Sequence, residues 1–188
     1  MPALSPAALR RRARDVRLFI FDIDGVLTDG LLYHIVDSAG TLIEFKGVNT
    51  QDSIALSWLP RLGLVTGCIS GRDSEGMSRR LRMLHVAYVY QGRLDKRAVF
   101  DEICRKARLA PRQALYIGDD LPDIPVLSAC GLAAAPANAR SEVKAAAHWV
   151  TRSAGGSGAV REAAELVLRA QGLWPKVLAL YDRTTDKP

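Results

Sequence analysis

Short apolar runs alternate with amphipathic helical segments along most of this 188-residue chain. Apolar runs bounded by turn residues are typical of buried strands, and apolar residues three or four positions apart are typical of helices. The predicted strands are residues 17–21, 64–69, 87–90, 114–117, 132–135 and 148–150. Because parallel strands need a crossover connection, this alternation predicts an α/β fold, a three-layer Rossmann-like doubly wound parallel sheet.

The pattern covers residues 17–172, a length typical of one domain. Residues 1–16 are predicted as a basic helical extension, because Ser5 and Pro6 are typical of a helix start. Residues 173–188 are predicted as a C-terminal tail. Two β-rich runs, 31–36 and 41–45, flank turn residues and predict a β-hairpin inserted after the first strand.

Composition excludes some function classes. With 48% hydrophobic and 24% charged residues, the chain is typical of globular proteins, and no apolar run reaches the ~20 residues needed to cross a membrane. The N-terminal segment lacks the apolar core of a secretory signal, so we expect a cytoplasmic protein. Cys68, Cys104 and Cys130 are odd in number and far apart, which indicates neither a disulfide nor a zinc site.

The net charge of +6 raises the question of nucleic-acid binding, because five arginines cluster between residues 10 and 17. No aromatic residues interleave with them, so a solvated helix face is favoured over a nucleic-acid-binding arm. We expect no nucleic-acid partner and no membrane partner. A basic surface also suits a small anionic substrate.

Acidic residues follow two of the predicted strands. Asp22 and Asp24 come after the first strand, and Asp119, Asp120 and Asp123 follow strand 114–117. The carboxyl ends of parallel strands share one edge of the sheet, where ligands bind, so these acids and Ser70 are predicted on one rim. Neighbouring carboxylates repel each other unless they share a cation or a proton. A simple acidic turn is the alternative for the Asp22 segment.

Carboxylate oxygens are hard ligands, so Asp22 and Asp24 with Asp119 predict a Mg²⁺ site. A carboxylate beside a metal can attack phosphorus and form an aspartyl phosphate. A hydroxyl and an ammonium group can then neutralise the phosphoryl oxygens, roles for which Ser70 and Lys96 are placed. Their structural alternatives are a helix cap for Ser70 and a solvated first-turn lysine for Lys96.

Four segments in order carry a resemblance to a known family: Asp-Ile-Asp-Gly-Val at 22–26, Ile-Ser-Gly-Arg at 69–72, Lys96, and Gly-Asp-Asp-Leu-Pro-Asp at 118–123. Together they resemble the haloacid dehalogenase superfamily of phosphatases. Since only a hairpin separates the first segment from the helix before the second, the chain resembles the branch that has no cap domain. Within that branch it is most similar to phosphatases of 3-deoxy-D-manno-octulosonate 8-phosphate, a lipopolysaccharide precursor.

The resemblance implies a role for each acid. Asp22 would be the nucleophile and a metal ligand, and Asp119 a further ligand. Asp24 would bind Mg²⁺ through its backbone carbonyl. Its carboxyl would act as the general acid for the leaving alkoxide and as the general base for the water. Asp120 or Asp123 would contact the metal ligands without binding the metal itself. The substrate-binding residues implied are Thr50, Ser70, Gly71, Arg72, Arg80 and Lys96.

Two residue choices point to different substrates. Relatives usually have Asp-Gly where this chain has Asp52-Ser53, and the segment 49–53 looks more like phosphatases of the nine-carbon analogue. Arg72 is what the eight-carbon enzymes carry, and its guanidinium can pair with a sugar-acid carboxylate. The resemblance therefore implies an octulosonate 8-phosphate phosphatase, with the nine-carbon acid phosphate or a non-catalytic domain of this fold as alternatives.

The predicted hairpin carries more apolar side chains than a free two-stranded ribbon can shield. They are Leu32, Tyr33, Ile35, Val36, Leu42, Ile43 and Phe45. A pocket without a cap also needs a cover to exclude water. In the family these hairpins assemble subunits, so the resemblance implies a homotetramer in which a neighbour lines the pocket.

Overall fold

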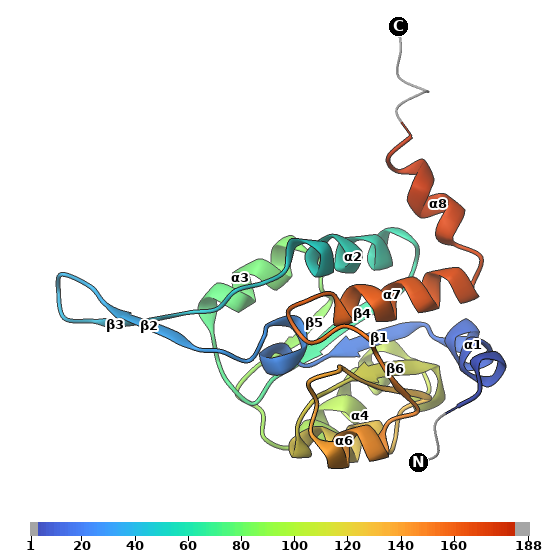
Figure 1. The fold of residues 1–188 in the computed structure, drawn as a ribbon, viewed down its shortest axis with the longest axis horizontal. Coiled ribbons are helices and arrows are strands. Elements are labelled where there is room, and N and C mark those ends of the chain that lie inside the picture. The colour runs from blue at the N-terminus through green and yellow to red at the C-terminus, as the bar shows by residue number, and fades with distance from the viewer. Residues whose placement is uncertain (1–3, 183–188) are drawn as a thin grey trace, which may run out of the picture.

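In a computed structural model, residues 4–182 are described as a six-stranded parallel sheet with helices on both faces (Figure 1). The strand order is β5-β4-β1-β6-β7-β8, and every neighbouring pair is parallel. The strands are β1 (Leu18–Phe21), β4 (Val65–Ile69), β5 (Tyr88–Tyr90), β6 (Ala114–Ile117), β7 (Leu132–Ala135) and β8 (Trp149–Val150). The predicted doubly wound α/β fold is confirmed.

The chain builds the sheet outward from β1, first through β4 to β5 and then, on the other side, through β6 to β8. This reversal creates a topological switch point beside the carboxyl ends of β1 and β6. Ligands of doubly wound folds bind at such a point, because the crossover connections diverge there and leave a crevice.

Two apolar cores lie on opposite faces of the sheet. Neighbouring residues of β1 alternate between them: Phe19 and Phe21 face one core, and Leu18 and Ile20 face the other. The first core is covered by α1 (Pro6–Asp15), α2 (Thr50–Arg61), α3 (Glu75–Met83) and α7 (Ala159–Ala170). The second is covered by α4 (Lys96–Ala107), α5 (Ile124–Leu127) and α6 (Ser141–Ala146).

The predicted hairpin is formed by β2 (Tyr33–Val36) and β3 (Leu42–Phe45), which pair antiparallel. It reaches away from the body of the molecule (Figure 1). The described residues contain no cap domain between the hairpin and α2, in agreement with the branch implied by the sequence. Within residues 4–182, none of the helices combines the length and apolarity needed to span a membrane.

Both terminal segments contain a helix. The predicted N-terminal helix is α1, which Ser5 caps by accepting a hydrogen bond from the Ala8 N–H. Two arginines of the basic cluster bond back to the body: Arg12 to the Gly131 carbonyl at 2.6 Å and Arg14 to the Ala170 carbonyl at 3.2 Å. The basic cluster therefore serves in part to attach α1.

The C-terminal segment contains α8 (Trp174–Ala179), a helix that the sequence analysis did not predict. Trp174 packs edge-on against Trp58 of α2, with ring centroids 5.8 Å apart. The Trp58 indole N–H also donates to the Tyr181 hydroxyl at 2.7 Å. These aromatic contacts stabilise a segment too short to be helical alone. The last part of the predicted tail, 183–188, lies outside the described residues, as do residues 1–3.

Asp52 joins the starts of α2 and α7. Its side chain is fully buried, and its carboxylate accepts hydrogen bonds from the backbone N–H groups of Gly158 and Arg161 at 3.0 and 2.8 Å. These donors lie at the first turn of α7, where N–H groups lack partners within the helix. The carboxylate therefore caps α7 from a neighbouring helix.

We expect Asp52→Ala to lower the free energy of unfolding by about 1–3 kcal/mol, because it leaves buried donors unpaired. Urea unfolding followed by circular dichroism would measure this change. Asp101→Ala is the matched control: Asp101 is exposed and pairs with Arg97 on the surface of α4, so its loss is expected to change stability by less than about 0.5 kcal/mol. Equal effects of the two substitutions would contradict the capping role.

Candidate active site

An open pocket lies over the carboxyl ends of β1, β4 and β6, at the predicted rim. We call it the acid pocket. Its lining residues are Asp22, Asp24, Gly25, Asp29, Gly30, Ser70, Gly71, Arg72, Leu94, Lys96, Asp119, Asp120, Pro122 and Asn138. Asp22 follows β1 directly, Ser70 follows β4 directly, and Asp119 comes two residues after β6. The parallel sheet thus brings together residues that are far apart in the sequence.

Asp22 is held from two sides. Its Oδ1 accepts the Ile23 N–H at 2.7 Å, and its Oδ2 lies 2.9 Å from Lys96 Nζ. The residue is only 6% exposed. Burial raises the pKa of Asp22 to about 7, and the charge of Asp123 adds to this shift while Lys96 opposes it. Such a carboxylate is fixed in orientation and poorly hydrated, which suits a nucleophile.

Asp119 faces Asp22 across the pocket. Burial raises the pKa of Asp119 to about 8, with repulsion from Asp22 and Asp123 adding to the shift. Its Oδ1 is buried and accepts no hydrogen bond from residues 4–182. A buried carboxylate oxygen without a donor is costly, so this oxygen fits the role of a cation ligand.

Gly25 makes room for the Asp119 carboxylate. Its φ of +84° favours glycine, and a Cβ at this position would collide with the Asp119 side chain. Its carbonyl accepts a hydrogen bond from the Asn138 side chain at 3.0 Å, and Asn138 in turn accepts the Gly155 N–H at 2.7 Å. The turn after β1 is therefore fastened to two distant loops.

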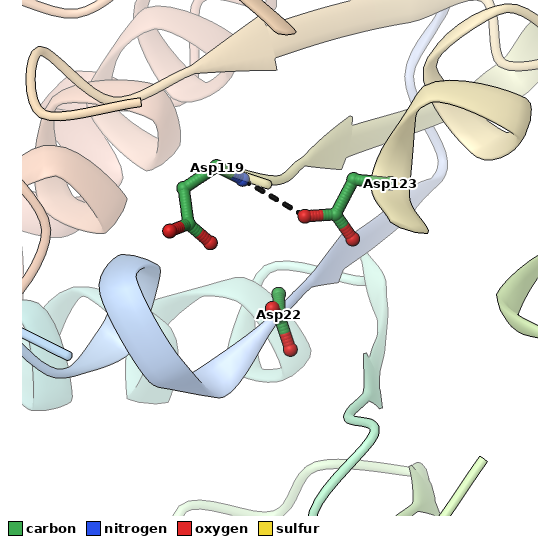
Figure 2. A group of neighbouring side chains, drawn as sticks. All are labelled: Asp22, Asp119 and Asp123. Carbon is green, nitrogen blue, oxygen red and sulfur yellow. Dashed lines mark hydrogen bonds between the residues drawn. The ribbon is translucent and has the colours of Figure 1, made fainter. Parts of the chain in front are cut away.

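Asp123 organises the loop that carries Asp119. It is fully buried, and Oδ1 accepts from Lys96 Nζ at 2.7 Å and from the Tyr116 hydroxyl at 2.6 Å. Oδ2 accepts the backbone N–H groups of Asp119 and Asp120 at 2.9 and 3.1 Å. Figure 2 shows the bond to the Asp119 N–H. Four donors thus occupy the Asp123 carboxylate, whereas the Asp120 side chain is exposed and bonds to the Leu121 N–H.

Lys96 lies between Asp22 and Asp123 and is itself 5% exposed. Burial alone would lower the pKa of Lys96, but the two ion pairs raise it above its ordinary value. The lysine is therefore charged at any physiological pH. It begins α4 and also lines the pocket, so it is not the solvated lysine of the structural alternative.

The three carboxylates of Asp22, Asp119 and Asp123 lie within 4.8 Å of one another (Figure 2). Each Asp123 oxygen has two donors, whereas each Asp22 oxygen has one partner and Asp119 Oδ1 has none in the described part of the chain, so Asp22 and Asp119 keep lone pairs for a cation. Both belong to the predicted ligand set. Two carboxylates with an open coordination sphere fit Mg²⁺, which keeps several water or phosphate ligands. The side chain of the third predicted ligand, Asp24, is not part of this cluster because it pairs with Lys46. Its backbone carbonyl remains for the metal-binding role that the resemblance implies.

The Asp24 side chain pairs with a lysine that the sequence analysis did not identify. Lys46 Nζ lies 2.7 Å from Asp24 Oδ1 and 3.0 Å from Oδ2. The predicted substrate residue Arg72 is also paired with the hairpin, since its Nη2 lies 2.7 Å from Glu44 Oε2. The sequence prediction relied on the carboxyl ends of parallel strands meeting at one edge of the sheet. The hairpin residues Glu44 and Lys46 lie outside that sheet, so this argument could not predict them. Asn138 was also missed, although it follows the carboxyl end of β7 and the same argument could have predicted it.

Of the other predicted substrate residues, Ser70 and Gly71 line the acid pocket, whereas Thr50 and Arg80 do not. Thr50 is exposed at the start of α2. Arg80 lines a separate cavity between the hairpin and α3, together with Lys46 and Met77. Within one chain the structure therefore brings neither of them to the acids.

Sequence and structure comparisons identify the family. A family model described as haloacid dehalogenase-like hydrolase matches residues 83–162. The 3-deoxy-D-manno-octulosonate 8-phosphate phosphatases of Yersinia pestis and Escherichia coli K12 are each 38% identical over 161 residues, 86% of this chain and 84% of theirs. The chain belongs to the haloacid dehalogenase-like hydrolases, in their phosphatase branch. The predicted family is confirmed.

A solved structure of the same kind is similar over almost the whole chain. It is the 3-deoxy-D-manno-octulosonate 8-phosphate phosphatase of Moraxella catarrhalis, which is 32% identical with a TM-score of 0.88. The match covers 95% of this chain and all of that one, and that crystal contains magnesium, phosphate and the sugar acid KDO. The match extends the likeness beyond residues 83–162 to the hairpin and the rim.

The raised pKa values of Asp22 and Asp119 predict how stability depends on pH without divalent cations. An unfolded aspartate has a pKa of about 3.9, so between about pH 4 and pH 8 the folded protein binds more protons than the unfolded chain. We therefore expect the melting temperature in EDTA to fall as the pH rises from 5.5 to 8. Asp119→Asn should remove much of this slope and raise the melting temperature at pH 8 by several degrees.

The matched control is Asp120→Asn, which changes an exposed aspartate of the same loop and should leave the slope in place. Differential scanning fluorimetry across the pH range measures all three proteins. A melting temperature of the unmodified protein that rises between pH 5.5 and 8 would contradict the assignment.

Proposed function

We propose that this chain is a Mg²⁺-dependent phosphatase that hydrolyses 3-deoxy-D-manno-octulosonate 8-phosphate to KDO and phosphate in the cytoplasm. The observation that carries the proposal is the acid pocket: an oriented, buried Asp22 faces an Asp119 oxygen without a donor, beside Ser70 and Lys96. The relatives named for this activity match along most of the chain, which supports the substrate.

The chain's own residues supply the steps of the reaction. An oxygen of Asp22 attacks phosphorus, and the bond between phosphorus and the sugar oxygen breaks while the Asp24 carboxyl gives that oxygen its proton. Water then attacks the aspartyl phosphate, Asp24 takes a proton from the water, and phosphate leaves with Asp22 restored. Ser70 and Lys96 hold the phosphoryl oxygens. Mg²⁺, held by Asp22, Asp119 and the Asp24 carbonyl, would neutralise charge on the phosphoryl group.

The structure bears on the choice between eight-carbon and nine-carbon substrates. Asp52 and Ser53, which resemble the nine-carbon enzymes, are buried and lie outside the acid pocket. Asp52 has a structural role as the cap of α7. Arg72, which resembles the eight-carbon enzymes, lines the pocket with its side chain about half exposed. These positions favour the eight-carbon acid, and Arg72 would bind its carboxylate after parting from Glu44.

We expect purified protein with Mg²⁺ to release phosphate from the octulosonate 8-phosphate, with a higher kcat/KM than for the nine-carbon analogue. Asp22→Asn should lower turnover by several powers of ten, because the amide cannot attack phosphorus. A phosphate-release assay measures both, and circular dichroism checks that the variant is folded. Activity of the unmodified protein no higher than that of Asp22→Asn would favour a non-catalytic domain of this fold.

We also propose that the protein assembles as a homotetramer through the hairpin. One face of the ribbon is an exposed apolar surface formed by Tyr33, Ile35, Ile43 and Phe45, which are 44%, 53%, 41% and 49% exposed. Tyr33 and Phe45 stack on this face with centroids 5.2 Å apart. Because the hairpin projects from the body (Figure 1), its own domain leaves this surface in water, which is unfavourable for a stable monomer.

Light scattering at micromolar concentration should give about four chain masses. Ile35→Glu combined with Ile43→Glu places like charges on opposite strands of the apolar face and should yield smaller species. Glu substitutions at Arg79 and Arg97, on exposed helix surfaces, form the control and should leave the mass unchanged. A monomeric unmodified protein with full activity would overturn the proposed assembly.

A further inference from the structure

Lys46 connects the hairpin to the acid pocket. It follows β3 directly, and strand alternation places it on the same face as Glu44, opposite the apolar face. Its side chain is only 3% exposed, although lysine is normally solvated. Its ammonium group contacts both oxygens of Asp24, and Glu44 Oε1 lies 3.6 Å away. The hairpin therefore places a buried charge against Asp24, a residue that lines the acid pocket.

The contact is more than a surface ion pair. Burying an ammonium group costs hydration free energy, and such a group persists only where carboxylates compensate it. Asp24, for its part, is on the irregular turn after β1, and its carboxylate accepts no other hydrogen bond within residues 4–182. Among residues 4–182, Lys46 is therefore the residue whose hydrogen bond fixes the direction of the Asp24 carboxylate.

Building on the proposed function, we propose that Lys46 is a positioning residue that aims the Asp24 carboxyl at the leaving oxygen. Proton transfer depends on placement within hydrogen-bond reach, and the fixed contact from Lys46 would supply that placement. Lys46 itself neither gains nor loses a proton: the proton passes from Asp24 to the sugar oxygen and returns to Asp24 from water. The hairpin would thereby orient the acid–base group of its own chain.

The test compares leaving groups. A sugar alkoxide needs a proton to leave, whereas 4-nitrophenoxide leaves without one. We expect Lys46→Met to lower kcat for the octulosonate 8-phosphate by roughly 10- to 100-fold, with KM changed by less than about 3-fold. The kcat for 4-nitrophenyl phosphate should stay within about 3-fold. An equal loss on both substrates would mean a structural role and overturn the proposal.

Lys106→Met is the matched control, since Lys106 forms an exposed ion pair with Glu102 outside the pocket and should change neither rate. A double mutant gives an independent readout. If Lys46 acts through Asp24, adding Lys46→Met to Asp24→Asn should lower the rate little further, whereas multiplying losses would contradict this. If Lys46→Met does not fold, Lys46→Gln, which keeps a side-chain donor of shorter reach, gives the same comparison.

A wrong substrate and a wrong role for Lys46 give different results. If the unmodified protein hydrolyses 4-nitrophenyl phosphate but not the octulosonate 8-phosphate, the proposed substrate is wrong. Glycerol 3-phosphate, another alkyl ester, then serves as the substrate with a poor leaving group. A protein inactive on all three esters would overturn both proposals.

Discussion

The acid pocket depends on one buried ammonium group. Asp22, Asp119 and Asp123 come within 4.8 Å of one another, an arrangement that mutual repulsion would open. Lys96 lies between two of them and forms ion pairs of 2.9 and 2.7 Å. The Tyr116 hydroxyl and two backbone N–H groups complete the compensation at Asp123. What remains uncompensated is Asp119, and this is where a cation is needed.

The pocket combines parts of different rigidity. The carboxyl ends of β1, β4 and β6 carry the proposed nucleophile Asp22, the proposed phosphate-binding Ser70 and the loop of Asp119, and these strands are almost entirely buried. The groups paired with the acid–base residue and with Arg72 come instead from a two-stranded ribbon that projects from the body. In the proposed mechanism, the residues that act at phosphorus are therefore fixed by the core, whereas the residue that protonates the leaving group is oriented by the hairpin.

Much of this arrangement was predictable from sequence. Apolar runs that stop at Asp22, Ser70 and Gly118 mark strand ends, and strand ends of a parallel sheet meet at one edge. Lys96 follows no strand end, and its prediction came from its place in the first turn of a helix, from the need for a cation at the phosphoryl group and from the family pattern. Lys46 was not predictable. Its contact with Asp24 depends on where the returning strand of the hairpin lies relative to the turn after β1, and the periodicity of apolar residues carries no information on that. Helix α8 was missed because its stability comes from Trp58 and Tyr181, not from its own pattern.

The register of the hairpin carries a consequence for the pocket. Asp37 accepts hydrogen bonds from Ala39 and Thr41 in the connecting turn, and Gly40 adopts a φ of +80° there. These contacts set which residues face each other along the ribbon. A slip by one position would turn Phe45 toward Asp24 and Lys46 toward the neighbouring subunit of the proposed tetramer. The turn at the tip of the hairpin, far from the acids, therefore determines whether the Asp24 carboxylate contacts the ammonium group of Lys46 or the benzene ring of Phe45.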